Sequence, residues 1–513
     1  MSTLTALARA QAVAAGRAQP IATVRHLHVH DHPMVLIPLA MAGEANAPLA
    51  ALAGTDPASP ELLVVTQPRD RDERFRFADR LGRILIRYVD SFTDATEDVP
   101  TDRGKDIRTR YADAPQLWVP NPGGVDFLRL FGRSTRFRTV DGEHPVPATV
   151  PLLGRWLTFF ANSAEVPGSS LLANAVQALT LHWATGQSGA EDAQLGVLLA
   201  WIEEGAEAAR AVENGPVAGP ATDPDFDNRV LGPLIERDAP ELPEVLRELM
   251  LPTWERMWRT LNLLRRLPAG SRVAGRWDGD KDAYTAFAQY VAEGGAPQPR
   301  RDGAVAAAAR LQRLESAAAR YAVQRAFDDP LVLAEYRLAG AAFAGTVTLA
   351  APDRIDDSGK RPVLRPRIMV RTAEAVRVEP GAVLTSPARP GQKARVVSVT
   401  PVPAAGLAAS AGDRAAVPAA DRTGLAAPPG DPAVAAADPA AAPPVAGEFD
   451  VLLELSGGMG RKLVAEPGSV PAVGERLVLT TLSDEFRRGG VLPDPSETPW
   501  THGGPPVGDE SPA

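Results

Sequence analysis

The chain contains no cysteine among its 513 residues, and only 5% of the residues are aromatic. The lack of cysteine excludes disulfides, thiolate-bound zinc, iron–sulfur clusters and cysteine nucleophiles. Long apolar runs are also missing, since the longest, PMVLIPLAMAG, is far below the ~20 residues of a membrane-spanning helix. Residues 1–20 lack the apolar centre of a signal peptide, so we expect a cytoplasmic protein that makes no membrane contact.

Positive charge is in deficit over the whole chain. The formal net charge of −9 argues against a surface coated throughout for nucleic acid, although a local basic module is compatible with it. The length exceeds that of one ordinary core, because domains typically contain roughly 100–200 residues. We therefore expect several structural units.

Three kinds of pattern follow one another along the sequence. Residues 1–147 alternate short apolar segments with amphipathic ones, which predicts an α/β domain. Residues 148–335 carry apolar side chains at helical spacing, which predicts an all-α domain. Short alternating segments from residue 336 onward are typical of a small β-barrel of SH3-like or OB-like size. The expected fold is thus multidomain: an N-terminal α/β head, a helical middle and a C-terminal barrel.

An Ala/Pro/Gly-rich insert interrupts the barrel pattern. Residues 402–447 contain too little apolar surface to order themselves, so we predict that this insert is disordered. It divides the barrel into residues 336–401 and 448–488. Such a long loop is tolerable because the entropic cost of closure rises only logarithmically with length. Residues 489–513 are expected to form an extended tail.

The head contains three informative stretches. TVRHLHVHDHPMVLIPLAMAG alternates on both sides of Asp31–Pro33, which predicts two strands joined by a tight turn. RDRDERFRFADRLGRILIRYV predicts an amphipathic helix. QLWVPNPGGVDFLRLF predicts a strand, a Pro/Gly turn and a helix.

Four of the seven histidines lie in the short run RHLHVHDHP. On a strand, His26, His28 and His30 project to one face, and residues two positions apart are separated by about 6.5–7 Å. Two imidazoles at that spacing can both reach a zinc ion, because Zn–N distances are about 2.0–2.1 Å. We therefore take these three histidines as candidate metal ligands, with zinc as the candidate cofactor. The alternative is an exposed strand face without a cofactor.

This run resembles the HxHxDH signature of the metallo-β-lactamase superfamily, but it is one residue out of register. After His26-x-His28-x the chain continues with His30-Asp31-His32, where the signature requires Asp-His. His144, His182 and His502, the remaining histidines, complete no such pattern. The departure puts in doubt the ligand set that the resemblance implies, and we assign no catalytic residue.

The first part of the barrel is locally basic. Residues 343–400 contain ten Lys and Arg against five Asp and Glu. In RPRIMVRT, alternate arginines are expected to point outward, where they can meet a phosphate backbone. Barrels that bind single strands normally add stacking aromatics, which are scarce here, so an arginine-rich surface without a function is the alternative. The candidate nucleic-acid or partner site consists of Arg365, Arg367, Arg371, Lys393 and Arg395.

Three functions remain open. The first is a non-catalytic scaffold or accessory protein of a nucleic-acid-processing complex, with a protein partner and with nucleic acid as a further partner. The second is a metal-dependent hydrolase or nuclease that uses the histidine run. The third is a purely protein–protein adaptor. The stretches HVHDHPMVLIPLAMAGEANAPLAAL and LSGGMGR resemble uncharacterised multidomain proteins of actinobacteria, a resemblance that implies no activity and no site residue.

Overall fold

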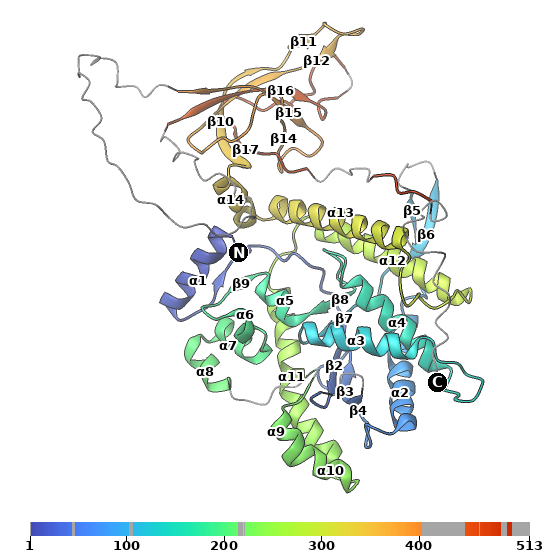
Figure 1. Cartoon of the computed structure of the whole chain (residues 1–513). Coiled ribbons are helices and arrows are strands. Elements are labelled where there is room, and N and C mark those ends of the chain that lie inside the picture. Colours follow the sequence, from blue (N-terminus) through green and yellow to red (C-terminus); the bar gives the residue numbers. More distant parts are fainter. Residues whose placement is uncertain are drawn as a thin grey trace, which may run out of the picture. The chain divides into compact units, whose positions relative to one another are not determined.

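The computed structural model of the chain forms two compact units, which are coloured along the sequence in Figure 1. Unit 1 comprises residues 1–335 and 484–513, and unit 2 comprises residues 336–483. The structure describes residues 2–43, 47–101, 106–213, 219, 221–402, 447–460, 462–483 and 490–494. The expected disordered insert, apart from its first and last residue, and most of the expected tail lie outside these described residues.

A five-stranded mixed sheet lies at the centre of unit 1, with the strand order β4-β3-β2-β7-β8. The antiparallel part consists of β4, β3 and β2, whereas β2, β7 and β8 run parallel. The strands are β2 (Met34–Ala40), β3 (Pro48–Gly54), β4 (Glu61–Val64), β7 (Leu117–Val119) and β8 (Leu172–Asn174). Because parallel strands end at the same edge, the turns after β7 and β8 lie side by side.

Helices cover both faces of the sheet. On one face lie α2 (Arg71–Asp90), α3 (Pro122–Thr135), α4 (Thr149–Ser163) and α12 (Val273–Ala292). On the other face lie α5 (Ala175–Thr180), α7 (Leu195–Glu203) and α11 (Leu242–Arg265). Every residue of β2 is buried, and its side chains alternate between the two cores, Leu36 into one and Ile37 into the other. This three-layer arrangement explains why MVLIPLA is a continuous apolar run.

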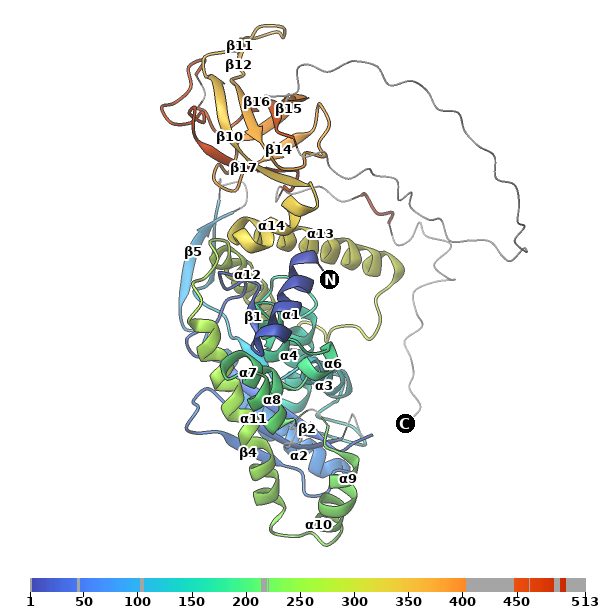
Figure 2. The ribbon, with the colours of Figure 1, turned by 90° about the vertical axis from the view of Figure 1, so that its left-hand side faces the viewer.

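The remaining elements of unit 1 surround these layers. They are α1 (Thr3–Ala15), β1 (Gln19–Pro20), β5 (Thr96–Pro100), β6 (Ile107–Tyr111), β9 (Trp183–Ala184), α6 (Gly189–Asp192), α8 (Ala206–Val212), α9 (Pro224–Phe226), the π-helical turn Asp227–Leu231, α10 (Gly232–Glu236) and α13 (Ala304–Asp328). The next helix, α14 (Pro330–Leu338), begins in unit 1 and ends in unit 2. The helices α12 and α13 lie alongside each other in Figures 1 and 2, joined by the Arg276–Gln324 hydrogen bond of 3.0 Å.

The expected division between residues 147 and 148 falls inside unit 1. Strand β8, helix α4 and helix α12 all follow that position, yet they complete the sheet and one of its cores. The stretch SLLANAVQALTLHWATG, which we expected to be helical, begins with β8 before α5 starts at Ala175. A three-residue strand buried beside β7 leaves almost no pattern in the sequence, which is why the helical interpretation extended over it.

Unit 2 is a closed six-stranded barrel with the order β10-β13-β16-β15-β14-β17. Its strands and the small pair beside it are β10 (Ala342–Ala351), β11 (Ile355–Asp356), β12 (Val363–Leu364), β13 (Arg367–Thr372), β14 (Val383–Thr385), β15 (Lys393–Pro401), β16 (Phe449–Ser456) and β17 (Arg476–Thr480). Inward residues such as Ile368, Val370 and Leu453 form its apolar core. The expected mixed α/β content and the β-barrel are therefore confirmed. No helix in the described part of the chain has the length and apolar character needed to cross a bilayer.

Candidate functional site

The histidine run from Arg25 to Pro33 forms no strand: it bends at Leu27 and at Asp31 and His32, and its one pairing is an isolated bridge between Arg25 and Ala269. Its alternate backbone N–H groups bond to side chains: His26 to His182 Nε2 (3.1 Å), His28 to Ser170 Oγ (3.0 Å) and His30 to Gln116 Oε1 (2.9 Å). The two-residue alternation of the sequence therefore corresponds to an alternation of backbone hydrogen bonds, but the expected first strand is absent. Side chains far away in the sequence take the place of a neighbouring strand.

The Gln116 side chain anchors this segment to the sheet. Its Nε2 donates to the carbonyl oxygens of His28 and Ser170, both at 2.8 Å. Its Oε1 accepts from Trp118 Nε1 at 2.8 Å as well as from the backbone of His30. All the bonding capacity of this buried amide is therefore used within the fold.

The rings of His28 and His30 have different surroundings. The His28 ring stacks on Trp277 with 4.1 Å between the ring centroids. Burial, with His30 nearby, lowers the pKa of His28 to about 4. The His30 Nδ1 accepts from the backbone N–H of His32 at 2.9 Å, and its Nε2 lies 3.0 Å from Asp113 Oδ2. Both ring nitrogens of His30 are thus occupied by protein groups.

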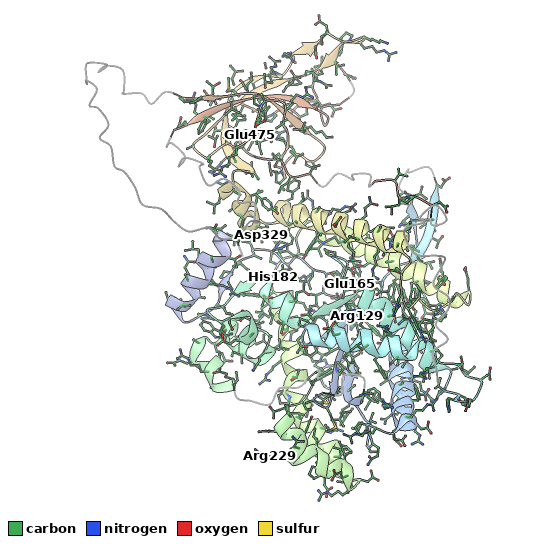
Figure 3. The ribbon with its side chains drawn as sticks, viewed as in Figure 1. Arg129, Glu165, His182, Arg229, Asp329 and Glu475 are labelled. Atoms are coloured by element: carbon green, nitrogen blue, oxygen red, sulfur yellow. The ribbon has the colours of Figure 1, made fainter. Side chains whose placement is uncertain are left out.

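The side chain of His26 belongs to a buried cluster with His182 and Asp329, the latter two labelled in Figure 3. The two imidazoles stack with 5.6 Å between centroids. The His26 Nε2 lies 3.4 Å from Asp329 Oδ2, without the alignment of a hydrogen bond. Burial by itself raises the pKa of Asp329, but His26 and the N–H groups of Thr23 and Leu331 lower it to about 2.

The three candidate metal ligands therefore do not meet at one point. His26 faces Asp329, His28 faces Trp277 and His30 faces Asp113. Among the described residues, no group of three or more His, Asp or Glu side chains is placed to hold a metal ion. The metal-dependent hydrolase stays a prediction from the sequence.

We expect Asp329→Ala to destabilise unit 1 by roughly 3 kcal/mol, because it leaves buried N–H donors without an acceptor. Asp329 accepts from the backbone of Thr23 at 2.7 Å and of Leu331 at 2.9 Å. Urea unfolding followed by tryptophan fluorescence measures the change. Asp31→Ala, at an exposed position of the histidine run, is the control and should leave the unfolding midpoint unchanged. Equal midpoints for the two variants would contradict the prediction.

Two cavities flank the loop of residues 166–169, which leads from α4 to β8. The first, of about 430 Å³, lies beside β8 between α3 and α5. Its charges are balanced locally, because Arg129 pairs with Asp126 at 2.6 Å and with Glu165 at 3.2 Å. Arg129 and Glu165 lie together in Figure 3. The second cavity, of about 590 Å³, lies on the other side of the loop, against α12 and α13.

Asp280 is the most strongly perturbed carboxyl group at the second cavity. It is buried on α12, and its Oδ2 accepts from the backbone N–H of Ser170 at 2.7 Å. Burial raises its pKa to about 7, although the hydrogen bonds from Ser170 and Ser169 and the charge of Arg276 act in the opposite direction. A carboxyl group with this pKa exchanges its proton near neutral pH.

The barrel carries a second candidate surface on the outward side of β10, β13, β16 and β15. One row across the strands pairs Leu349 with Met369 and Met369 with Leu452. The next row places Glu454 between Arg367 and Arg395. Leu349 is 52% exposed, whereas Met369 and Leu452 are partly buried. We call these two rows together the barrel face.

The structure brings together part of the set predicted for the barrel. Arg354 and Arg367 bind Glu454 at 2.8 Å and 3.1 Å, and Arg395 lies opposite the same carboxylate. Lys393 lies two residues from Arg395 on β15, and Arg365 lies two residues before the start of β13. Arg371 lies at the far end of β13, in a two-fold hydrogen bond with Asp450 at 2.8 Å. Of the five predicted residues, Arg367 binds Glu454 and Arg395 is paired with it across the strands.

Reasoning from the sequence missed Asp280 and the cavity beside it. The only local signal is the pair of glycines in AGRWDGDKD, one helical turn apart on α12. The burial of Asp280 depends on Ser170, 110 residues away in the sequence. Comparisons of the chain with protein-family models, with curated proteins and with solved structures found no match in any of the three.

Proposed function

We propose that the protein is a non-catalytic accessory protein that binds a protein partner through the barrel face. The observation that carries the proposal is the apolar row of Leu349, Met369 and Leu452 between charged rows, exposed at Leu349 and partly buried at the other two. Methionine and arginine are enriched at protein interfaces, where an apolar centre is surrounded by a polar rim. The partner that fits this face presents an apolar side chain flanked by carboxylates.

Two features favour a protein over a nucleic acid as the partner. Arg367 and Arg371, which we expected to meet phosphates, already bind Glu454 and Asp450. The only aromatic residues of the six barrel strands are Phe343 in the core and Phe449 at the first position of β16. The barrel face therefore lacks the stacking side chains that hold unpaired bases.

Nucleic acid remains the second candidate because of the surplus of cations around Glu454. Arg354, Arg367 and Arg395 surround that single carboxylate. A phosphate backbone would be held there by charge alone, and its affinity would fall steeply as salt is added. The proposal includes a barrel of SH3-like or OB-like type and a cytoplasmic location.

The substitution Leu349→Asp tests the barrel face. Because this side chain is half exposed, the change should leave the barrel folded and weaken the partner's binding at least about tenfold, since it places a charge in the apolar row. The full-length chain is used to capture proteins from a lysate of its source cells, and captured proteins are quantified by mass spectrometry. The affinity of the protein lost with Leu349→Asp is then measured with purified components.

The matched control is Val473→Asp, which introduces the same charge at a 63% exposed valine outside the barrel strands. A partner lost equally from both variants, or from neither, contradicts the proposal. In parallel, a labelled single strand and a labelled duplex are titrated with the full chain at low and moderate salt. Tight, salt-sensitive binding that Leu349→Asp leaves intact would favour the nucleic-acid alternative.

A further inference from the structure

The cavity of about 590 Å³ in unit 1 has the size typical of small-molecule sites, roughly 300–1,000 Å³. We call it the α12–α13 pocket. Its walls are one side of α12, one side of α13 and the loop of residues 166–169. Gly168 in that loop has a φ of +90°, and a Cβ there would lie 2.9 Å from Arg276 Cδ. The loop therefore packs directly on Arg276, which fixes one wall of the pocket.

Two arginines line the α12–α13 pocket without an ion pair to a carboxylate. The buried Asp280 also lines the pocket and its charge acts on Arg276, but its raised pKa leaves it only partly ionised at neutral pH. Arg276 donates to Gln324 Oε1 at 3.0 Å and to the carbonyl oxygen of His26 at 2.9 Å, both neutral acceptors, and its buried Nε has no partner. Arg320 is exposed on α13. No carboxylate of the described residues forms an ion pair with either arginine, whereas Arg272 at the pocket's end pairs with Asp328. A half-buried cation of this kind gains free energy when an anion joins it.

Two glycines of α12 expose helix backbone to the pocket between the side chains of Arg276 and Asp280. Gly275 and Gly279 lie one turn apart inside α12, and both line the pocket. Glycine is among the least favourable residues inside a helix. Packing does not require it here, because a Cβ built at either position meets nothing within 4 Å. What the two glycines do is leave the helix backbone open to whatever occupies the pocket.

We propose that the α12–α13 pocket binds a small organic anion, a phosphate or a carboxylate, held by Arg276 and Arg320 against the glycine surface of α12. Two guanidinium groups match the oxygens of either anion by charge-assisted hydrogen bonds. The neighbouring cavity beside β8 lacks this surplus, because its Arg129 is already paired with Asp126 and Glu165. The site lies in unit 1 and is independent of the partner proposed for the barrel face.

Isothermal titration calorimetry of the full chain, at constant ionic strength, tests the proposal with three probes: inorganic phosphate, adenosine monophosphate and succinate. We expect saturable 1:1 binding of at least one probe at millimolar concentration or below. Phosphate and the nucleotide without succinate would identify a phosphate site, and succinate without the other two a carboxylate site. No saturable binding of any probe overturns the proposal.

Arg320→Gln is the diagnostic variant, because an exposed side chain can be replaced without disturbing the fold. We expect it to weaken binding at least tenfold. Arg313→Gln removes the same charge from an exposed position of α13 outside the pocket, and should bind as the unmodified chain does. Equal affinities for the two variants would mean that the anion lies elsewhere, which also overturns the proposal.

The variant Gly279→Ala distinguishes an effect on ligand binding from an effect on folding. We expect this variant to unfold at a higher temperature, since alanine favours the helix, and yet to bind the probe more weakly, since the methyl group narrows the pocket. Unchanged or tighter binding would contradict contact with the glycine surface. Leu349→Asp, which alters only the barrel face, should leave the probe's affinity unchanged, so failure of this site and failure of the barrel proposal are distinguishable.

Discussion

Gly154→Ala is expected to destabilise unit 1 by about 3 kcal/mol, because it overpacks the place where α4 touches the end of α3. A Cβ at Gly154 would lie 2.2 Å from the backbone nitrogen of Arg136 and 2.6 Å from its Cα. The clash is with backbone rather than with a flexible side chain, so the two helices must move apart. Gly132 on α3 makes the reciprocal close approach, with its Cβ position 2.8 Å from Thr158 Oγ1.

Tryptophan fluorescence during urea unfolding measures this effect selectively. All eight tryptophans lie outside residues 336–483, so the signal follows unit 1 and not the barrel. The control is Gly275→Ala on α12, the same substitution at a position where the new methyl group meets nothing within 4 Å. It should stabilise unit 1 by up to about 1 kcal/mol. Changes of the same sign in both variants would show that α3 and α4 do not approach as closely as described.

Elements with a strong local pattern could be predicted from the sequence. RDRDERFRFADRLGRILIRYV predicts a helix, and α2 spans Arg71–Asp90 with Asp70 accepting hydrogen bonds at its start. QLWVPNPGGVDFLRLF predicts a strand, a turn and a helix, which correspond to β7 and α3, with Pro122 in the first turn of α3. In each case the period, the cap and the turn residues agree, so local and tertiary preferences point to the same structure.

The histidine run could not be predicted in the same way. Its alternation indicates an extended backbone, but alternation does not reveal whether the N–H groups bond to a strand or to side chains. Here they bond to His182, Ser170 and Gln116, which are brought close only by the complete fold. The three imidazoles face different neighbours, which alternation in the sequence cannot indicate.

The two candidate surfaces differ in how far the sequence could indicate them. The barrel's arginines were identified from local charge, but the carboxylates that face them come from β16, beyond the insert of residues 402–447. The sequence indicates the α12–α13 pocket even less clearly. Its arginines lie on two helices that resemble any other solvated helical surface, and its size depends on the loop that packs on Arg276.

Asp280→Asn is expected to gain stability relative to the unmodified chain as the pH rises from 5 to 8. The folded state holds the Asp280 proton up to a pKa of about 7, whereas the unfolded chain releases it near the ordinary value of 3.8. Between these values the folded state binds more protons, so the free energy of unfolding falls as pH rises, by about 1.4 kcal/mol per pH unit for one proton. From pH 5 to pH 8 the contribution of Asp280 should thus fall by about 3 kcal/mol, and the stability of Asp280→Asn relative to the unmodified chain should rise by that amount. The lowered pKa values of His28 and His182 make stability rise with pH in both proteins, so their contribution cancels in this difference.

The asparagine variant isolates the ionisation because its amide oxygen can still accept from the backbone of Ser170. Arg276 is the charged group that acts on Asp280, and it is unchanged in the variant.

Asp282→Asn, two residues further along α12, supplies a control of opposite sign. Burial by itself raises the pKa of Asp282, but hydrogen bonds from Arg108 and Arg110 lower it below the ordinary value. The charged form of Asp282 therefore stabilises the fold at pH values above that ordinary value. Asp282→Asn should therefore destabilise unit 1 slightly at pH 8, where Asp280→Asn stabilises it. Urea unfolding at a series of pH values separates the two, and parallel profiles for the unmodified chain and Asp280→Asn would mean that Asp280 is ionised throughout.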